Sequence, residues 1–233
     1  IEGALNANGN VWVLNGAGVL FGRTAQVNVG GLVASSLALS ARASLAARPS
    51  LSGPSPAGQV SNAAQINAHG GVVALVAPVV RNSGRIAASN VALAAGEQVT
   101  LDFSGDGLLS YTIDRAALDA LVENSGSLSG NTVSLSARSA SAAVATVVNN
   151  EGVIEATGLS ESGGRIVLEG GDNGADHVAG TLDASSAAAR GGSIAVTGRA
   201  LTLDGGATLA ANGATGGGSI HVGGGYQGQD PSL

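Results

Sequence analysis

The stretches VRNSGRI (80–86), VENSGSL (122–128) and VNNEGVI (148–154) repeat one pattern, Val-x-Asn-x-Gly-x-(Ile/Leu). A degenerate copy, VSNAAQI, lies at 60–66. Successive copies begin 20, 42 and 26 residues apart, and the interval of 42 can hold two units. Repeats of this length indicate a solenoid, in which each unit buries its apolar face only against its neighbours.

A second pattern, Gly-Gly-x-Ile-x-(Val/Leu), occurs as GGRIVL (163–168), GGSIAV (191–196) and GGSIHV (217–222). Between the repeats, stretches such as NVALAA, QVTLDF and TVSLSA alternate apolar with small or polar residues, which is typical of half-buried strands. Together these patterns predict an all-β parallel β-solenoid. Val, Ile and Leu form inward ladders, and Asn at the turns bonds the backbone of the next coil. At a strand spacing of ~4.8 Å we expect about nine or ten coils.

Three segments depart from the repeats. Residues 41–59 are rich in proline, serine and glycine, which predicts a surface loop. Residues 114–123 (DRAALDALVE) have a helical pattern with Asp114 as N-cap, and residues 139–148 predict a second short helix. Both helical pieces run directly into a Val-x-Asn-x-Gly copy. We therefore interpret residues 1–233 as a single domain with a loop and two helical excursions.

The composition excludes several function classes. The net charge is −6, all ten basic residues are arginines, and aromatic residues make up 2% of the chain. A chain of this kind is a poor partner for nucleic acid or anionic lipid. Cysteine is absent, which excludes disulfides, thiol catalysis and Cys-metal sites. The uninterrupted apolar runs are far shorter than the ~20 residues of a membrane-spanning helix.

The search for catalytic chemistry finds no convincing site. Each of the three histidines is isolated in a different repeat: His69, His177 and His221. Asp102 and Asp106 are the nearest carboxylate pair for a β-helix hydrolase, but a solvated turn explains them better. GGDNGADHV at 170–178 resembles a calcium-binding nonapeptide, but it is a single copy with Asp172 in place of a glycine. We predict no enzyme, no cofactor and no metal site, and retain a β-helix polysaccharide lyase or hydrolase as the weaker alternative.

Residues 1–36 carry the most specific signal. The chain begins IEGALNANGNVWVLNGAGVLFGRTAQVNVGGLVASS, and from Ile1 to Ser36 it resembles, nearly residue by residue, the secretion domain of two-partner secretion exoproteins. This is the filamentous haemagglutinin family. The later repeats, the region after VTLDFSGDGL and the end GGGYQGQD resemble the same family.

The resemblance implies a right-handed parallel β-helix that is exported to the periplasm and then through an outer-membrane β-barrel transporter. The transporter's periplasmic transport-associated domains recognise the secretion domain. Family members are large secreted or cell-surface adhesins, haemagglutinins, haemolysins or contact-dependent toxins. We expect a monomer that does not insert into a membrane, and a host receptor or glycan as partner of the full-length protein. The resemblance makes the following residues candidates for transporter recognition: Asn6, Asn8, Gly9, Asn15, Gly18, Phe21, Gly22, Asn28, Gly30 and Gly31.

One turn departs from the family pattern. The family's Asn-Pro-Asn-Gly is here Asn15-Gly16-Ala17-Gly18, so the proline and the second asparagine are replaced. Gly16 still permits a tight turn but lacks the fixed φ of proline. Recognition is therefore sought across the whole block. Ile1 is not Met and the first residues already resemble the interior of a domain, so we expect a piece of a longer protein, truncated at both ends.

Two readings of the N-terminal block remain open, a core role and a partner contact. Alternation places one set of apolar residues in the core of the first coils: Val11, Val13, Val19, Phe21, Val27 and Val29. Trp12, the only tryptophan, is expected to pack near a cap. A second candidate function is a glycan- or receptor-binding adhesin module.

Overall fold

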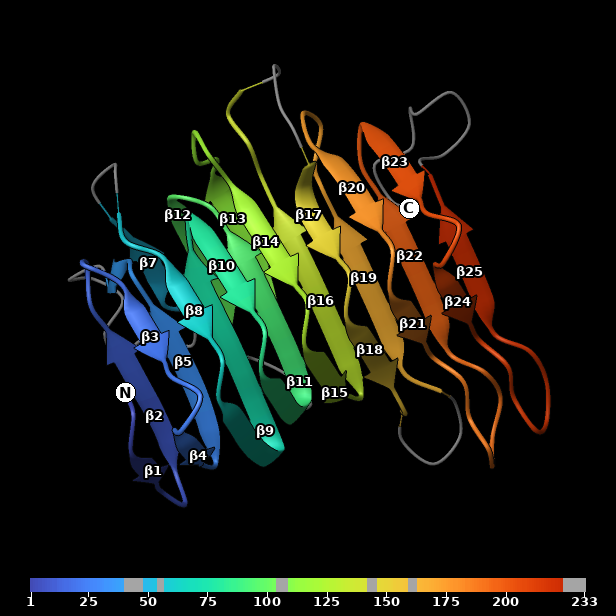
Figure 1. Ribbon diagram of the computed structural model, residues 1–233, viewed down its shortest axis with the longest axis horizontal. Coiled ribbons are helices and arrows are strands. Elements are labelled where there is room, and N and C mark those ends of the chain that lie inside the picture. The colour runs from blue at the N-terminus through green and yellow to red at the C-terminus, as the bar shows by residue number, and fades with distance from the viewer. Residues whose placement is uncertain (40–47, 54–56, 104–108, 142–145, 159–162, 224–233) are drawn as a thin grey trace.

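The chain winds into a parallel β-helix in which strands stack side by side from the N-terminal to the C-terminal end (Figure 1). This confirms the β-solenoid predicted from the repeats. The computed structural model describes residues 1–39, 48–53, 57–103, 109–141, 146–158 and 163–223.

Each coil contributes a strand to three parallel faces, and the long strands β9 and β11 run through the first two faces. The first face contains β1 (Ala4–Asn6), β4 (Gln26–Asn28), β9 (Gln65–Ala77), β11 (Arg85–Ala95), β15 (Ser127–Gly130), β18 (Val153–Ala156), β21 (Thr181–Asp183) and β24 (Thr208–Ala210). The second face contains β2 (Asn10–Leu14), β5 (Gly31–Ser35), the later parts of β9 and β11, β16 (Thr132–Ala137), β19 (Arg165–Glu169), β22 (Ser193–Thr197) and β25 (Ser219–Val222). The third face contains β3 (Val19–Phe21), β8 (Val60–Asn62), β10 (Val79–Asn82), β14 (Leu121–Asn124), β17 (Thr146–Asn150), β20 (Ala175–Val178) and β23 (Ala200–Leu203).

The described strands make seven complete coils and two faces of an eighth. The expectation of nine or ten coils was wrong, because several coils contain excursions whose residues do not belong to the three faces. The register nevertheless places similar side chains above one another in successive coils. In the first face one inward ladder runs through Leu5, Val27, Ile66, Ile86, Leu128, Ile154, Leu182 and Leu209. Its members from Val27 to Leu182 are fully buried, and each contributes roughly 1.5–3 kcal/mol of hydrophobic stabilisation.

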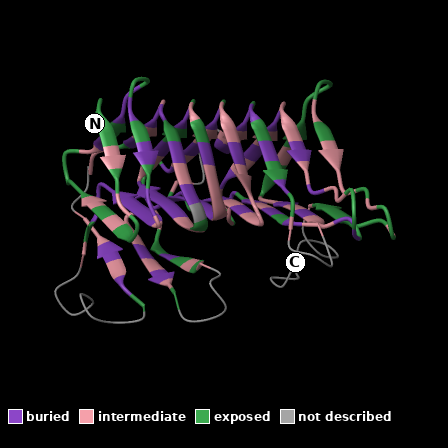
Figure 2. Cartoon of the chain, turned by 90° about the horizontal axis from the view of Figure 1, so that it is seen from below, coloured by how far each residue is buried: buried purple, intermediate pink, exposed green. Residues whose placement is uncertain are grey.

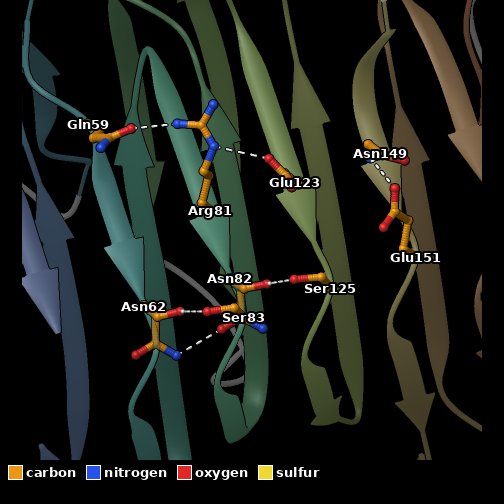
Figure 3. A network of polar contacts seen from close by, with 9 residues as sticks. All are labelled: Gln59, Asn62, Arg81, Asn82, Ser83, Glu123, Ser125, Asn149 and Glu151. Atoms are coloured by element: carbon orange, nitrogen blue, oxygen red, sulfur yellow. Dashed lines mark hydrogen bonds and ion pairs between the residues drawn. The ribbon is translucent and has the colours of Figure 1, made fainter. Parts of the chain in front are cut away.

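The Val-x-Asn-x-Gly repeat forms a buried ladder of amides on the third face. Its members are Asn62, Asn82, Asn124 and Asn150. Each Nδ2 donates to the Oδ1 of the next asparagine, over 2.8, 2.8 and 2.7 Å (Figure 3 shows the first two residues). The register places Phe21 before the ladder and Val178 after it, so apolar residues close both ends. The sequence predicted bonds to the next coil's backbone, whereas the amides bond to one another and, at Asn62, Asn82 and Asn150, to the backbone two residues further on in their own coil.

A separate antiparallel sheet covers the outside of the second face at the N-terminal half, on the lower left of Figure 2. Its strands, in the order β13-β12-β7-β6, are β13 (Ser110–Arg115), β12 (Gln98–Asp102), β7 (Ser50–Ser52) and β6 (Ala38–Leu39). Leu51, Val99 and Leu101 pack against outward residues of the β-helix, including Val33 and Ala74. The predicted loop 41–59 therefore contains a strand, and its residues 41–47 and 54–56 lie outside the described residues.

The helix predicted over 114–123 was wrong. Asp114 and Arg115 end β13, and the last three residues of the range begin β14. Between them, Ala117 donates its N–H to the carbonyl of Arg138 and pairs with Ser139 in the next coil. Leu118, expected on the apolar side of the helix, is 63% exposed. Hydrogen bonds between coils therefore outweigh the local helical pattern.

The second predicted helix, 139–148, was also wrong where it is described. Ser139 forms a bridge to the preceding coil, and Thr146–Val148 belong to β17. Residues 142–145 lie outside the described residues. The described part of the chain contains no helix, and accordingly none that is long and apolar enough to cross a membrane.

Candidate functional site

The first coil that the structure describes consists of β1, β2 and β3. Among the described strands, β1, β2 and β3 each pair on one side only, with β4, β5 and β8. The inward residues Leu5, Val11 and Val13 of this coil are only partly buried, whereas Phe21 and Val27 are fully buried. The core role predicted for the alternating residues of the block is therefore confirmed.

The outward positions of this coil carry exposed apolar side chains. Trp12 and Leu14 on β2 are 38% and 37% exposed, and Leu20 on β3 is 55% exposed. The Trp12 ring lies 6.0 Å from that of Phe103, centroid to centroid, at an interplanar angle of 57°. A pocket of about 90 Å³ lies between these rings and Val33.

Trp12, which the sequence predicted to pack near a cap, packs against Phe103 and points outward from β2. Inward Val11 and Val13 already imply an outward Trp12 by the two-residue period of a strand. Sequence reasoning missed this signal, together with the outward Leu14 and Leu20.

Five of the ten candidate residues offer exposed polar groups at the first two coils: Asn6, Asn8, Gly9, Asn15 and Asn28. Asn28 donates from Nδ2 to Oδ1 of Asn6 over 3.2 Å, and Asn67 donates in the same way to Asn28 over 3.1 Å. These amides form a short ladder on the outside of the first face. They stay accessible in the folded domain.

Four other candidates are packing positions in the folded domain. Phe21 is fully buried in the core, and Gly22 and Gly31 are also buried. Gly30 donates its N–H to the carbonyl of Gly9 over 3.0 Å, and a Cβ there would lie 2.6 Å from the carbonyl oxygen of Asn8. These residues set the stacking of the first two coils.

The remaining candidate, Gly18, ends the turn that departs from the family pattern. The N–H of Gly18 donates to the carbonyl of Asn15 over 2.8 Å, and Oδ1 of Asn15 accepts from the N–H of Ala17 over 3.2 Å. The side chain of Asn15 thus closes the turn without the proline. Gly18 has φ +112°, and the N–H of Gly58 donates to the carbonyl of Gly16, so a returning excursion packs on the turn.

The residues weighed for catalysis occupy structural positions. Asp102 pairs with Arg48 over 2.7 Å, and Asp106 lies outside the described residues. His177 contacts Oδ1 of Asn149 through Nδ1 and Oδ2 of Asp204 through Nε2, over 2.7 and 3.1 Å. His221 is exposed on β25, and His69 belongs to β9. Within the described ranges, no group of three or more acidic or histidine side chains could hold a metal ion.

A row of polar contacts also crosses the outside of the third face. Arg81 donates to Oε1 of Gln59 over 2.6 Å and pairs with Oε2 of Glu123 over 3.0 Å (Figure 3). In a later coil, Asn149 donates to Glu151 over 3.2 Å. The Arg81 contacts join neighbouring coils, whereas Asn149 and Glu151 lie in the same coil. All are exposed or half-exposed, and a surface ion pair such as Arg81–Glu123 contributes only about 0–1 kcal/mol.

One acid of the 170–178 stretch faces the core. Asp176 is 1% exposed, and the register places it between Val148 and Leu201 on the third face. Burial raises the pKa of this carboxyl to about 8, and the nearby charge of Glu169 acts in the same direction. Asp172, the residue that departs from the nonapeptide, is exposed.

Comparison with known proteins now identifies the family. The TPS secretion domain, that is, the secretion domain of two-partner secretion exoproteins, matches residues 1–194. The chain belongs to the TPS secretion domain family. The HMW1 secretion domain from Haemophilus influenzae has a similar structure, with a TM-score of 0.81 and 26% sequence identity over 96% of this chain and 59% of that chain.

A heme/hemopexin-binding protein of Haemophilus influenzae is 29% identical over 189 residues. The match covers 74% of this chain and 20% of that relative, so the chain spans about a fifth of the length of the curated protein it matches. The TPS secretion domain is not an enzyme family. Exoproteins that carry it are secreted across the outer membrane.

Proposed function

We propose that a cognate outer-membrane β-barrel transporter recognises this TPS secretion domain through its first coil. The supporting observation is the group of outward, exposed apolar side chains on that coil: Trp12, Leu14 and Leu20. Apolar side chains of a partner would pack against these exposed ones and remove them from water. The periplasmic transport-associated domains of the transporter are the parts that would make this contact.

The β-helix suits a chain that folds after crossing the membrane. We propose that the chain stays unfolded in the periplasm and folds coil by coil outside the cell. Each new coil adds inward residues such as Ile86, Leu128 or Ile154 to the ladder, and each buried residue contributes roughly 1.5–3 kcal/mol. Folding outside would therefore oppose backward movement through the transporter.

The domain would serve as the first part of the β-helical scaffold of a large adhesin or haemagglutinin. The match to only 20% of the heme/hemopexin-binding protein supports this, because most of such a protein lies beyond the secretion domain. Contact with a host receptor or glycan would be made by the full-length protein. The expected destination is the extracellular space or the bacterial cell surface, reached through the periplasm, and the expected state is a monomer.

A secretion assay with the co-expressed transporter tests the recognition step. Deletion of residues 1–36 should abolish export, but it also removes the first coil. The sharper variant is the triple substitution Trp12→Ser, Leu14→Ser, Leu20→Ser, since all three side chains point outward and are exposed. The matched control is Leu118→Ser, which changes a 63% exposed leucine outside the first coil.

We expect the triple variant to lose most export while its urea unfolding midpoint changes little, and the control to be exported normally. Unchanged export of the triple variant and of the deletion would contradict the proposal. Binding of the transporter's purified transport-associated domains to the triple variant and to the Leu118→Ser control is measured directly. This measurement separates recognition from later folding.

A further inference from the structure

The corner between the first and second faces changes along the chain. In the third and fourth coils the corner is crossed inside the continuous strands β9 and β11, and in the fifth coil only Asn131 separates β15 from β16. In the seventh and eighth coils the corner is widened by the loops 184–192 and 211–218, and in the sixth coil the structure describes residues 157–158 and 163–164 of the corner. The earlier coils show that the β-helix needs no such loops.

The described residues of these corners are hydrogen-bonded to one another. Between the seventh and eighth coils, Ser186 donates its N–H to the carbonyl of Asn212 over 2.8 Å, and Gly191 donates to Gly216 over 2.9 Å. Gly163 of the sixth coil donates to the carbonyl of Arg190. The stacked loops therefore continue the inter-coil hydrogen bonding and form a wall beside the second face.

A groove of about 570 Å³ lies along this corner. Its described lining consists of glycine pairs, hydroxyl or amide residues and two arginines: Asn131, Thr132, Gly158, Gly163, Gly164, Arg165, Arg190, Gly191, Gly192, Ser193, Gly217, Gly218 and Ser219. Both arginines are exposed, and no described ion pair engages either guanidinium group. The described lining contains no acidic residue, although the chain as a whole has a net charge of −6.

The main chain of the groove is largely occupied. The N–H groups of nine lining residues already donate to backbone carbonyls: Asn131, Gly163, Gly164, Arg165, Gly191, Gly192, Ser193, Gly218 and Ser219. A peptide could not add as a strand here, because few backbone donors are free. The free groups are guanidinium and hydroxyl donors, which suit a ligand that offers anionic groups and hydroxyls.

We propose that this groove binds a linear acidic polysaccharide whose chain runs along the β-helix axis. Coils repeat every ~4.8 Å, which is close to the length of one sugar unit, so successive coils can meet successive sugars. Arg165 and Arg190 bind carboxylate or sulfate groups of the sugar through the forked geometry of guanidinium. Thr132, Ser193 and Ser219 are placed to bond sugar hydroxyls. This binding site is additional to the transporter contact and does not depend on it.

Isothermal titration of the 233-residue chain with size-defined oligogalacturonates tests the proposal. Dextran sulfate fragments probe sulfate in place of carboxylate, neutral dextran fragments probe the need for charge, and poly-glutamate probes a peptide polyanion. The test variant is Arg165→Gln with Arg190→Gln. The matched control is Arg85→Gln, an exposed arginine on β11 outside the groove lining.

We expect binding of one or both acidic glycans, none of neutral dextran, and a loss of about tenfold or more in the double variant but not in the control. Unchanged thermal unfolding of the variants shows that the fold is kept. Absence of acidic glycan binding, equal binding by the double variant, or equally tight binding of poly-glutamate would each overturn the assignment.

Discussion

The N-terminal and C-terminal halves of this β-helix share one stacking scheme but differ in what surrounds it. In the N-terminal half the second face presents Val33, Ala74 and Ala92 outward, and a four-stranded sheet buries them. In the C-terminal half the same register carries Val167 and Ala195, which are partly exposed. Stacked corner loops, and not a covering sheet, mark that half. The common core thus fixes the fold, while the outer residues decide which accessory structure each half has.

The halves also differ inside the third face, and this difference carries the largest expected effect. One inward ladder reads Val60, Val80, Val122 and Val148, and then Asp176. The folded state raises the pKa of this carboxyl from 3.8 to about 8, so it binds more protons than the unfolded state between these values. Stability should therefore fall as the pH rises from about 4 to about 8, by several kcal/mol.

Urea unfolding at pH 5 and pH 8 measures this slope. Asp176→Asn should remove most of it and make the protein more stable than the unmodified chain at pH 8, while the two proteins should differ less at pH 5. An equally steep loss of stability in Asp176→Asn would show that other groups cause the pH dependence.

The covering sheet of the N-terminal half gives the next largest effect. Leu101 of β12 is fully buried between this sheet and the β-helix. Leu101→Ala should cost about 2–5 kcal/mol of unfolding free energy, because it leaves a cavity where the sheet packs. Leu203→Ala, at a 44% exposed position of the C-terminal half, is the control and should cost far less. Equal losses in urea unfolding would mean that the sheet contributes little to stability.

The asparagine ladder of the third face is buried and that of the first face is exposed, so the two show how burial changes the contribution of an amide hydrogen bond. Asn124 accepts from Asn82 and donates to Asn150, and all three are buried. Asn124→Ala leaves two buried amide groups without their partners and should cost about 2 kcal/mol or more. Asn28→Ala breaks the equivalent bonds in the exposed ladder, where water replaces them, and should cost a few tenths of a kcal/mol. Chemical denaturation of both variants decides whether burial makes this difference.

The sequence predicted the parallel stacking because inward ladders need like residues at regular spacing, and the repeats show that spacing directly. It could not predict the covering sheet. The alternating pattern of β12 predicts one more strand of the β-helix. The sequences of β7 and β13 do not show that these strands leave the coil and pair antiparallel with β12. The two helices failed for a related reason, since a local apolar pattern cannot report that Ala117 is bonded to the next coil.

The candidate recognition residues were chosen by family resemblance, which mixes surface with packing positions. Phe21 and Asn28 both lie in the matching block, yet one is buried and the other is exposed. Strand alternation, which places Phe21 and Val27 inward, already implies an outward Asn28. The same period around Val11 and Val13 would have added Trp12 and Leu14 to the outward residues. The local sequence pattern does not predict the groove at the C-terminal half, because the groove depends on how the described corner residues of three coils stack.

The smallest expected effect concerns the corner between the second and third faces of the first coil, which the four-residue turn Asn15–Gly18 closes. Gly18 has φ +112°, and a Cβ there would lie 2.7 Å from the carbonyl oxygen of Gln59. Gly18→Ala should therefore cost about 1–2 kcal/mol through backbone strain and this contact. A Cβ at Gly16 would have only the carbonyl oxygen of Ser36 within 4.0 Å, so Gly16→Ala should be close to neutral. If thermal unfolding shows that Gly16→Ala destabilises the protein more than Gly18→Ala, the hydrogen bonds of Asn15 are not what stabilises the turn. The departure of the turn from the family pattern would then affect folding as well as recognition.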